Sequence, residues 1–328
     1  MRKLAFDGNS TISLKKCLNI LTEKKYVGVK KYLLLLDIIC SEYFIHSNLQ
    51  EYLFYDFYKL SYKERKKFLL IYHQQNYFRK VNSAGFVKNK MEMYEKTKQF
   101  YGRETIQIPE CGMAEFVEFV KKHKKVILKP LKGSYGKGIF VHEYTSDNDA
   151  ISTFICLNNK SYACEEFIIQ HQDMQKMNNS CVNTLRILTY YENGKANVVA
   201  AALRMGNGNS VVDNLRSGGI GANIDENTGI VDTVGMDYNG NVFEVHPTSG
   251  VSINGFKIPN WNKAIELVNN AAEVCKNCPI LAWDIAITED SAVLIEYNNR
   301  PGPMIHQFID KRPKGEKILE FIKKNTKN

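Results

Sequence analysis

The chain contains the segment Leu281-Ala-Trp-Asp-Ile-Ala-Ile-Thr-Glu-Asp-Ser-Ala-Val-Leu-Ile-Glu-Tyr-Asn298, in which two apolar runs carry three oxygen-bearing side chains. We predict a β-hairpin with its turn at residues 288–291. Because side chains alternate along a strand, Glu296 and Asn298 share one face. Antiparallel counting places Asp284 opposite Glu296 or the residue before it, depending on the turn type. The first register would bring together three hard oxygen ligands that suit Mg²⁺, whereas solvated carboxylates on an exposed face are the alternative.

A glycine-rich loop lies between two further predicted strands, Val126-Ile-Leu-Lys-Pro and Ile139-Phe-Val-His. Glycines let backbone N–H groups approach an anion closely, and lysines add positive charge. No helix follows the loop, and Leu131 stands where a Walker A loop has its first glycine, so we predict a flap over phosphates. An ordinary hairpin loop is the alternative. The candidate flap residues are Gly133, Ser134, Gly136, Lys137 and Gly138.

Further basic residues lie where they suit an anionic ligand. Lys129 ends the first of these strands and can reach a phosphate as a point charge, unless it extends to solvent. The stretch from Arg204 to Gly219 adds Asn214, Arg216 and a Gly-Gly step. Such groups suit a bound carboxylate and the charge that develops in phosphoryl transfer, although a solvated surface loop is the alternative.

The contribution of Arg186 depends on strand register. Two strands flank Glu192-Asn-Gly-Lys195, a strong signal for a tight hairpin turn. Strict pairing from that turn places Arg186 opposite residue 201, so that it faces away from Arg204, whereas a bulge would reverse this. We therefore rank Arg204 above Arg186.

Composition and length exclude several classes of protein. The chain has 328 residues, 44% hydrophobic and 24% charged, so we expect two or three folded domains rather than disorder. We find neither an apolar run long enough to cross a bilayer nor the features of a signal peptide. Of the eight cysteines, only Cys275 and Cys278 form a C-x-x-C pair, without the second pair that zinc needs. We expect a cytoplasmic protein with reduced thiols.

Positive charge is concentrated near the N-terminus. Residues 1–90 contain 17 lysines and arginines against 7 aspartates and glutamates, whereas the whole chain carries a net charge of +9. Half of the 18 tyrosines lie there too, and apolar residues recur at helical spacing. This mostly helical, basic region suits peripheral contact with the inner face of a membrane or with an anionic glycan. No base-reading motif accompanies it, so we expect no nucleic-acid partner. A solvated helix face is the alternative.

Taken in order, the motifs resemble the ATP-grasp superfamily. Two segments, Val182-Asn-Thr-Leu-Arg and Asp213-Asn-Leu-Arg-Ser-Gly-Gly, are similar to its sugar-transfer-associated subgroup, and the Arg…Asn…Gly-Gly stretch is similar to ribosomal-protein glutamate ligases. The resemblance implies an α+β fold in which two subdomains, residues 86–168 and 169–328, clasp ATP after a mostly helical domain at residues 1–85. The ordered motif run is Lys90, Lys129-Pro130, the glycine flap, Glu165-Glu166-Phe-Ile, Arg204, Asn214, Asp284, Glu296-x-Asn298 and Pro301-Gly302.

The resemblance also implies residue roles. Lys90 and Lys129 would contact phosphates, and the adenine would meet Glu165 or Glu166 and the backbone of Ile168. The acid that would bind the ribose is not evident among Gln170, His171 and Asp173. The implied ligands of Mg²⁺, or alternatively Mn²⁺, are Asp284, Glu296 and Asn298. The candidate catalytic residues are Arg186, Arg204, Asn214, Arg216 and Arg300.

The implied activity is ATP-dependent ligation. A carboxylate would attack the γ-phosphate to give an acyl phosphate, which an amine would then attack, with ADP and phosphate as by-products. The subgroup name points to carboxylate and amine substrates that are glycan precursors. A phosphotransferase acting on a sugar hydroxyl is the first alternative, and a non-catalytic adaptor at a glycan or membrane surface is the second.

Overall fold

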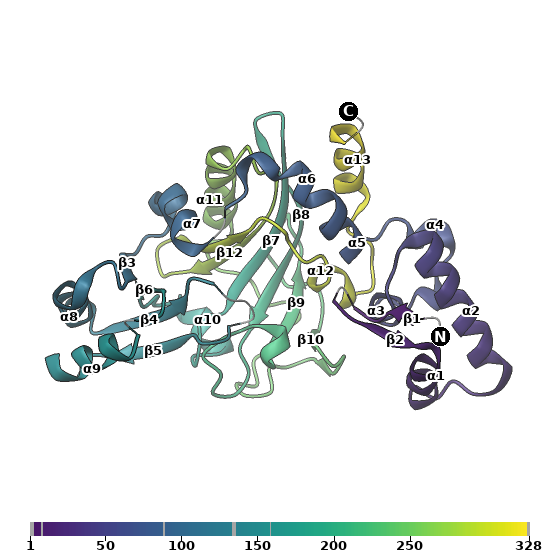
Figure 1. Cartoon of the computed structure of the whole chain (residues 1–328), viewed down its shortest axis with the longest axis horizontal. Helices are drawn as coiled ribbons and strands as arrows, with labels where there is room; N and C mark the ends of the chain where they lie inside the picture. The colour runs from purple at the N-terminus through teal and green to yellow at the C-terminus, as the bar shows by residue number, and fades with distance from the viewer. Residues whose placement is uncertain (1–2, 8, 88, 133–135, 158, 327–328) are drawn as a thin grey trace. The chain divides into compact units, whose positions relative to one another are not determined.

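The computed structural model describes residues 3–7, 9–87, 89–132, 136–157 and 159–326. The chain divides into two compact units, one of Met1–Ala84 with Arg300–Asn328 and the other of Gly85–Asn299 (Figure 1). The segment 300–328, which the sequence led us to group with the preceding residues, thus belongs to the first unit. Within the described residues, no helix combines the length and apolar character needed to cross a membrane.

The first unit is mostly helical, as predicted. Its helices begin at polar caps, because Ser13, Asn48 and Ser61 each accept a hydrogen bond from a backbone N–H three residues further on. A small antiparallel sheet of β1 (Lys3–Ala5) and β2 (Thr11–Ser13) precedes them. The α-helices are α1 (Leu14–Glu23), α2 (Gly28–Ile45), α3 (Leu49–Phe54), α4 (Tyr62–Arg65), α5 (Ile71–His73), α6 (Arg79–Val81), α12 (Ile305–Phe308) and α13 (Glu316–Asn325).

A buried glutamine ties the C-terminal segment into this unit. Gln307 on α12 is fully buried, and its Oε1 accepts hydrogen bonds from the N–H groups of Leu69 at 3.0 Å and Lys314 at 3.1 Å. Its Nε2 donates to the carbonyls of Leu69 at 2.8 Å and Pro303 at 3.2 Å. A buried backbone group without a partner costs about 1–3 kcal/mol, so one side chain satisfies polar groups on two distant segments.

We predict that Gln307→Leu lowers the free energy of unfolding by about 3 kcal/mol, because it removes these partners from buried backbone groups. Urea denaturation of the full chain measures this, with the exposed Gln75→Leu as the matched control. Equal loss of stability in both variants would contradict the role given to Gln307.

The second unit contains a seven-stranded antiparallel sheet with the order β11-β10-β9-β8-β7-β12-β13. The predicted hairpins are confirmed as β7–β8 and β12–β13. One face packs on α11 (Trp261–Val274), whose Ala264 and Val268 join Leu185 and Trp283 of the sheet in one core (Figure 1). The strands are β7 (Thr184–Glu192), β8 (Lys195–Met205), β9 (Ile220–Ile224), β10 (Gly235–Asp237), β11 (Val242–Phe243), β12 (Ile280–Ile287) and β13 (Ala292–Asn298).

A smaller antiparallel sheet of order β3-β6-β4-β5 belongs to the same unit. Helices α8 (Gly112–His123) and α9 (Asp147–Leu157) cover one face, where Leu128 and Cys164 pack with Phe116. The unit also contains α7 (Lys90–Thr97) and α10 (Gln172–Met177). The strands are β3 (Thr105–Ile108), which the sequence did not suggest, β4 (Lys125–Pro130), β5 (Phe140–Glu143) and β6 (Tyr162–Glu166).

Because side chains alternate along the strands, polar residues of both sheets lie on the faces opposite these helices. On β12, Trp283 and Ile285 lie in the core while Asp284 points to the other face. On β6, Cys164 lies in the core while Glu165 points away from α8 and α9. The ATP-grasp α+β architecture expected from the motifs therefore positions its polar residues through strand register.

Candidate active site

The β12–β13 hairpin has the register that collects the three candidate metal ligands. Asp284 pairs with Glu296, and Ala282 pairs with Asn298. Directly after Asp284 the register shifts, so Ile295 is the extra residue of a β-bulge. Since paired side chains share a face, Asp284, Glu296 and Asn298 lie on one side of the sheet.

A second bulge, in β8, brings Arg204 to the face that Asp284 shares with its direct partner Arg186. The sequence-based expectation that Arg186 turns away from Arg204 is wrong. The turn pairs Glu192 with Lys195 as expected, but the register shifts between Leu188 and the next residue, so that Arg186 opposes Ala202 and Thr184 opposes Arg204. One extra residue moves every later side chain to the other face, and both arginines consequently lie beside Asp284.

Asp284 is the centre of a buried ion-pair network. Only 2% of Asp284 is exposed, and its carboxylate forms ion pairs with Arg186 and with Arg204 at 3.3 Å. Arg204 also pairs with Asp213 at 3.2 Å and donates to the Thr184 hydroxyl at 2.9 Å. Burial raises the pKa of Asp284 while the two arginines oppose that shift. Burial alone would lower the pKa of Arg204, but Asp213 and Asp284 outweigh it and raise this pKa. The network thus keeps both arginines fixed and charged.

Glu296 is paired with Lys90, which begins α7. Their side chains form an ion pair in which the lysine is 23% and the glutamate 29% exposed. Burial would raise the pKa of Glu296, but the Lys90 charge outweighs it and holds the pKa at about 2. In turn, Glu296 raises the pKa of Lys90. Both groups stay ionised and partly open to solvent.

Glu165 joins a third cluster on the smaller sheet. Lys129 donates to Glu165 at 2.8 Å, and Arg103 donates to the same carboxylate from Nε at 2.8 Å and from an Nη atom at 2.6 Å. Burial would raise the pKa of Glu165, but these two cations hold it at about 2. For Lys129, burial lowers the pKa and Glu165 partly restores it.

Arg103 links the two sheets and was not found from the sequence. Besides Glu165 of β6, it donates to the carbonyl of Leu294 on β13 at 2.7 Å. A usable signal existed, because Glu165 lies in the apolar run Tyr-Ala-Cys-Glu-Glu-Phe-Ile-Ile and a buried carboxylate requires cations.

Gly136 of the predicted glycine flap lies near the loop that joins β8 to β9. Gly136 has φ +74°, and a Cβ there would lie 3.0 Å from Val212 of that loop. Gly219 ends this loop, and only glycine fits there, because a Cβ would lie 2.3 Å from the Asp213 carbonyl oxygen. Lys137 and Gly138 are exposed nearby in sequence. Two other predicted flap residues, Gly133 and Ser134, lie outside the described residues.

Other predicted residues have different surroundings. Glu166 points to the opposite face from Glu165 and lies 3.6 Å from His123, and Ile168 is half-buried after β6. Asn214 accepts a hydrogen bond from the backbone of Arg216 at 2.9 Å, while the exposed Arg216 guanidinium lies 5.0 Å from the Tyr238 ring centre. Arg300 belongs to the first unit, where its carbonyl accepts a hydrogen bond from Gln74.

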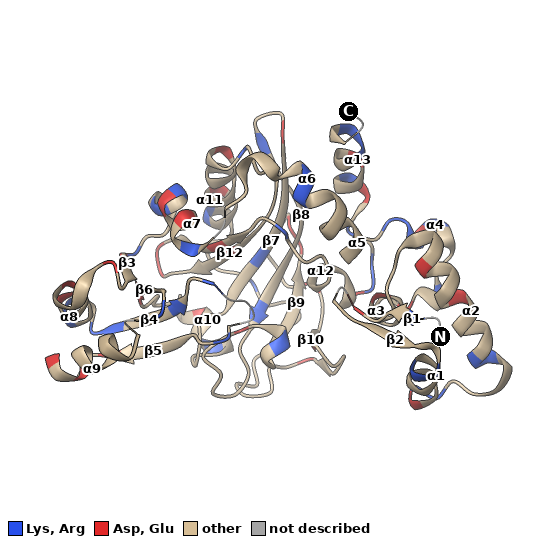
Figure 2. Ribbon diagram, viewed as in Figure 1, with Lys and Arg blue, Asp and Glu red and all other residues tan. Residues whose placement is uncertain are grey.

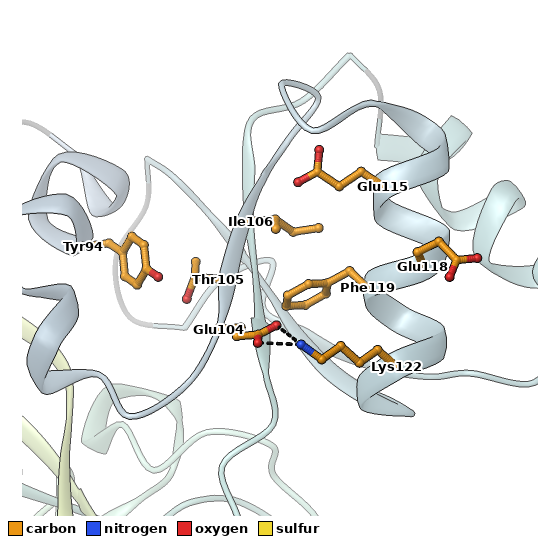
Figure 3. Close-up of a pocket in the computed structure, with 8 residues that line it drawn as sticks. All are labelled: Tyr94, Glu104, Thr105, Ile106, Glu115, Glu118, Phe119 and Lys122. Carbon is orange, nitrogen blue, oxygen red and sulfur yellow. Dashed lines mark hydrogen bonds and ion pairs between the residues drawn. The ribbon is translucent and has the colours of Figure 1, made fainter.

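A separate pocket of about 590 Å³ opens beside α8 (Figure 3). Its charged lining consists of three glutamates and one lysine, with Lys122 bound to Glu104 at 2.5 Å. Glu115 and Glu118 give it further negative charge, which is unfavourable for phosphates. The candidate residues for nucleotide binding do not line it. It is lined by Tyr94, Glu104, Thr105, Ile106, Glu115, Glu118, Phe119 and Lys122.

Comparison with known families shows the family to which the chain belongs. A sequence profile described as sugar-transfer associated ATP-grasp matches residues 72–315, which is well over half of the chain. The chain belongs to the sugar-transfer associated ATP-grasp family. A comparison of this ATP-grasp protein with curated proteins finds no match.

Several solved structures are similar to this ATP-grasp protein at low sequence identity. D-alanine–D-alanine ligase from Bacillus anthracis is 12% identical with a TM-score of 0.44, covering 72% of this chain and 66% of its own. The ATP-grasp ligase PsnB, complexed with minimal precursor, Mg and ADP, is 10% identical with a TM-score of 0.45 and coverage of 77% and 62%. The purK N5-carboxyaminoimidazole ribonucleotide synthetase, in its ADP complex, is 13% identical with a TM-score of 0.42 and coverage of 68% and 51%. The chain spans less than two thirds of the length of each.

The candidate ligand set has the chemistry of a magnesium site. Asp284 and Glu296 supply hard carboxylate oxygens, and Asn298 on the same face could add its amide oxygen. Across the described part of the chain, no three His, Cys, Asp or Glu side chains are grouped for metal binding.

We predict that Glu165→Gln lowers the free energy of unfolding by about 3–5 kcal/mol at pH 7, because it leaves Arg103 and Lys129 buried without a counter charge. The wild-type contribution is complete above the ordinary pKa of about 4.5 and is lost as the pH falls toward the folded-state value of about 2. The stability difference between wild type and variant should therefore shrink by about 2 kcal/mol between pH 5 and pH 3.

Denaturant titration across this pH range measures the difference. Glu166→Gln, at the neighbouring position on the opposite face, is the matched control and should change stability by less than about 1 kcal/mol. A pH-independent difference for Glu165→Gln would contradict the ionised, doubly paired state of this carboxylate.

Proposed function

We propose that the protein is a Mg²⁺-ATP-dependent ligase that activates a carboxylate as an acyl phosphate for attack by an amine, on a glycan precursor. The observation that carries the proposal is a group of four cations in an ATP-grasp chain, of which three pair with Asp284 or Glu296 and the fourth pairs with Glu165. Those cations are Lys90, Lys129, Arg186 and Arg204. The glycan part of the proposal rests on the family's description alone.

The ion pairs of the free protein favour an exchange of partners on nucleotide binding. Phosphate oxygens would take over Lys90 from Glu296 and would add a second anion near Lys129. The carboxylates of Asp284 and Glu296 would then be available, with Asn298, to hold Mg²⁺, which would neutralise charge on the phosphates. Until then the lysines and arginines replace the metal's charge, so the carboxylates remain ionised or paired rather than isolated.

The arginines suit the reacting groups. In the proposed reaction, a substrate carboxylate oxygen forms a bond to the γ-phosphorus while the bond from that phosphorus to the ADP oxygen breaks. The amine nitrogen then attacks the acyl carbon, phosphate leaves, and the amine proton passes to solvent. Arg186 and Arg204 are held by Asp284 and Asp213 rather than by water, so their charge is positioned before the phosphoryl group moves. The glycine flap would shield the acyl phosphate from hydrolysis.

A hydroxylamine trap tests the reaction class. The full chain is incubated with Mg²⁺-ATP, hydroxylamine and a panel of uronic acids and amino acids, and ADP and hydroxamate are measured together. The proposal predicts both products in equal amounts with at least one acid. A stable phosphate ester without hydroxamate would instead identify a kinase, and absence of both products would contradict an active enzyme.

We predict that Arg204→Met reduces the rate of ADP formation by a factor of at least about 100, because it removes a fixed charge from the developing phosphoryl group. Arg79→Met is the matched control, since Arg79 is an exposed arginine of α6 in the first unit. A loss of equal size in both variants would remove the special role of Arg204.

We also predict that Glu296→Gln weakens binding of Mg²⁺-ATP at least tenfold, as measured by calorimetry, with a smaller effect on ATP without metal. Glu266→Gln, at an exposed carboxylate of α11, is the control. Unchanged affinity in Glu296→Gln would place the metal elsewhere, and no binding by the wild type would favour the adaptor alternative.

A further inference from the structure

Helix α2 of the first unit presents an apolar stripe to solvent. Its members are 58–74% exposed, although each is a large aliphatic or aromatic residue. At 100° per residue they fall within one side of the helix, and the stripe extends for about 22 Å. A contiguous apolar surface of this kind marks an interaction site rather than chance exposure. The stripe consists of Val29, Tyr32, Leu33, Leu36, Tyr43 and Phe44.

The opposite side of α2 is buried within the first unit. Leu34, Ile38 and Ile45 are buried on the side turned toward the first unit. The helix is therefore apolar on two sides, and packing within its own unit accounts for one of them. The second side requires an external partner.

Lysines lie at both ends of the stripe. Lys24 and Lys30 are exposed at the N-terminal end, and Lys31 lies 5.6 Å from the centre of the Tyr32 ring. At the other end the Phe44 ring contacts that of Tyr62 on α4, which is followed by an exposed lysine. Figure 2 shows basic positions on α1 and α2. Apolar and aromatic side chains flanked by lysines are typical of helices that lie in a membrane interface.

The net positive charge of the first unit favours an anionic partner. Residues 1–84 and 300–328 contain 23 lysines and arginines against 10 aspartates and glutamates, a formal excess of 13 positive charges, whereas the rest of the chain has a small negative excess. A second copy docked through the same stripe would bring two such units together against their mutual repulsion. An anionic bilayer surface attracts the same unit instead.

We propose that α2 docks on the surface of an anionic phospholipid membrane, with its apolar stripe in the headgroup region and the flanking lysines on lipid phosphates. This would hold the chain at the membrane surface without a spanning segment. The inference rests on the first unit and is independent of the proposed ligase activity.

Vesicle sedimentation of the full chain tests the proposal. Vesicles of phosphatidylcholine with about one quarter phosphatidylglycerol are compared with phosphatidylcholine alone, at low salt and at about 0.5 M NaCl. We expect binding to the anionic vesicles, with at least a tenfold weaker partition coefficient at high salt or on neutral vesicles. We expect at least a tenfold loss from Leu33→Gln/Leu36→Gln at low salt.

Matched variants separate the stripe from general surface effects. Ile155→Gln/Val242→Gln removes two similarly exposed apolar side chains of the second unit and should bind as the wild type does. Lys24→Gln/Lys30→Gln should weaken binding, whereas Lys160→Gln/Lys195→Gln should not. Because all these positions are exposed, circular dichroism should be unchanged.

Three results would overturn the proposal. The first is absence of wild-type binding to anionic vesicles, and the second is full binding by the stripe variant. The third is a wild-type dimer in light scattering that Leu33→Gln/Leu36→Gln converts to monomer without any effect on vesicle binding, because the stripe would then bind a second copy.

Discussion

A buried carboxylate on an interior strand of a β-sheet must have cations beside it, and this constraint organises the second unit. Asp284 meets it through Arg186 on one neighbouring strand and Arg204 on the strand beyond. Arg186 lies opposite Asp284 in a regular ladder between β7 and β12, whereas Arg204 shares their face only because of a bulge in β8. Two bulges, one in β8 and one in β13, set the register in which the arginines, Asp284 and Glu296 share a face. The bulges are therefore part of the site.

The same reasoning explains what the sequence could and could not predict. Local signals were sufficient for the two hairpins, the helix α11 and the polar face of β13, because turn residues and alternation are encoded within a few positions. The orientation of Arg186 was wrong because a single extra residue in β8 has no reliable local signature. Arg103 escaped notice because its partners, Glu165 and the Leu294 carbonyl, lie far away in the sequence. The site assignments themselves remain predictions.

The two units differ in how their lysines and arginines are arranged. In the second unit, the lysines and arginines of the candidate site are paired with carboxylates. In the first unit, lysines outnumber carboxylates and lie beside the uncovered stripe of α2. The paired cations of the second unit suit a ligand that arrives with its own negative charge and metal, whereas the net positive charge of the first unit suits an extended anionic surface.

The central claim is that the Asp284 face of the large sheet is the nucleotide centre. A crystal structure of the full chain with Mg²⁺ and a non-hydrolysable ATP analogue tests it most directly. The account predicts Mg²⁺ about 2.1 Å from oxygens of Asp284, Glu296 and Asn298, with Lys90 on phosphate instead of on Glu296. A nucleotide bound elsewhere, with the Lys90–Glu296 and Arg186–Asp284 pairs intact, would contradict it.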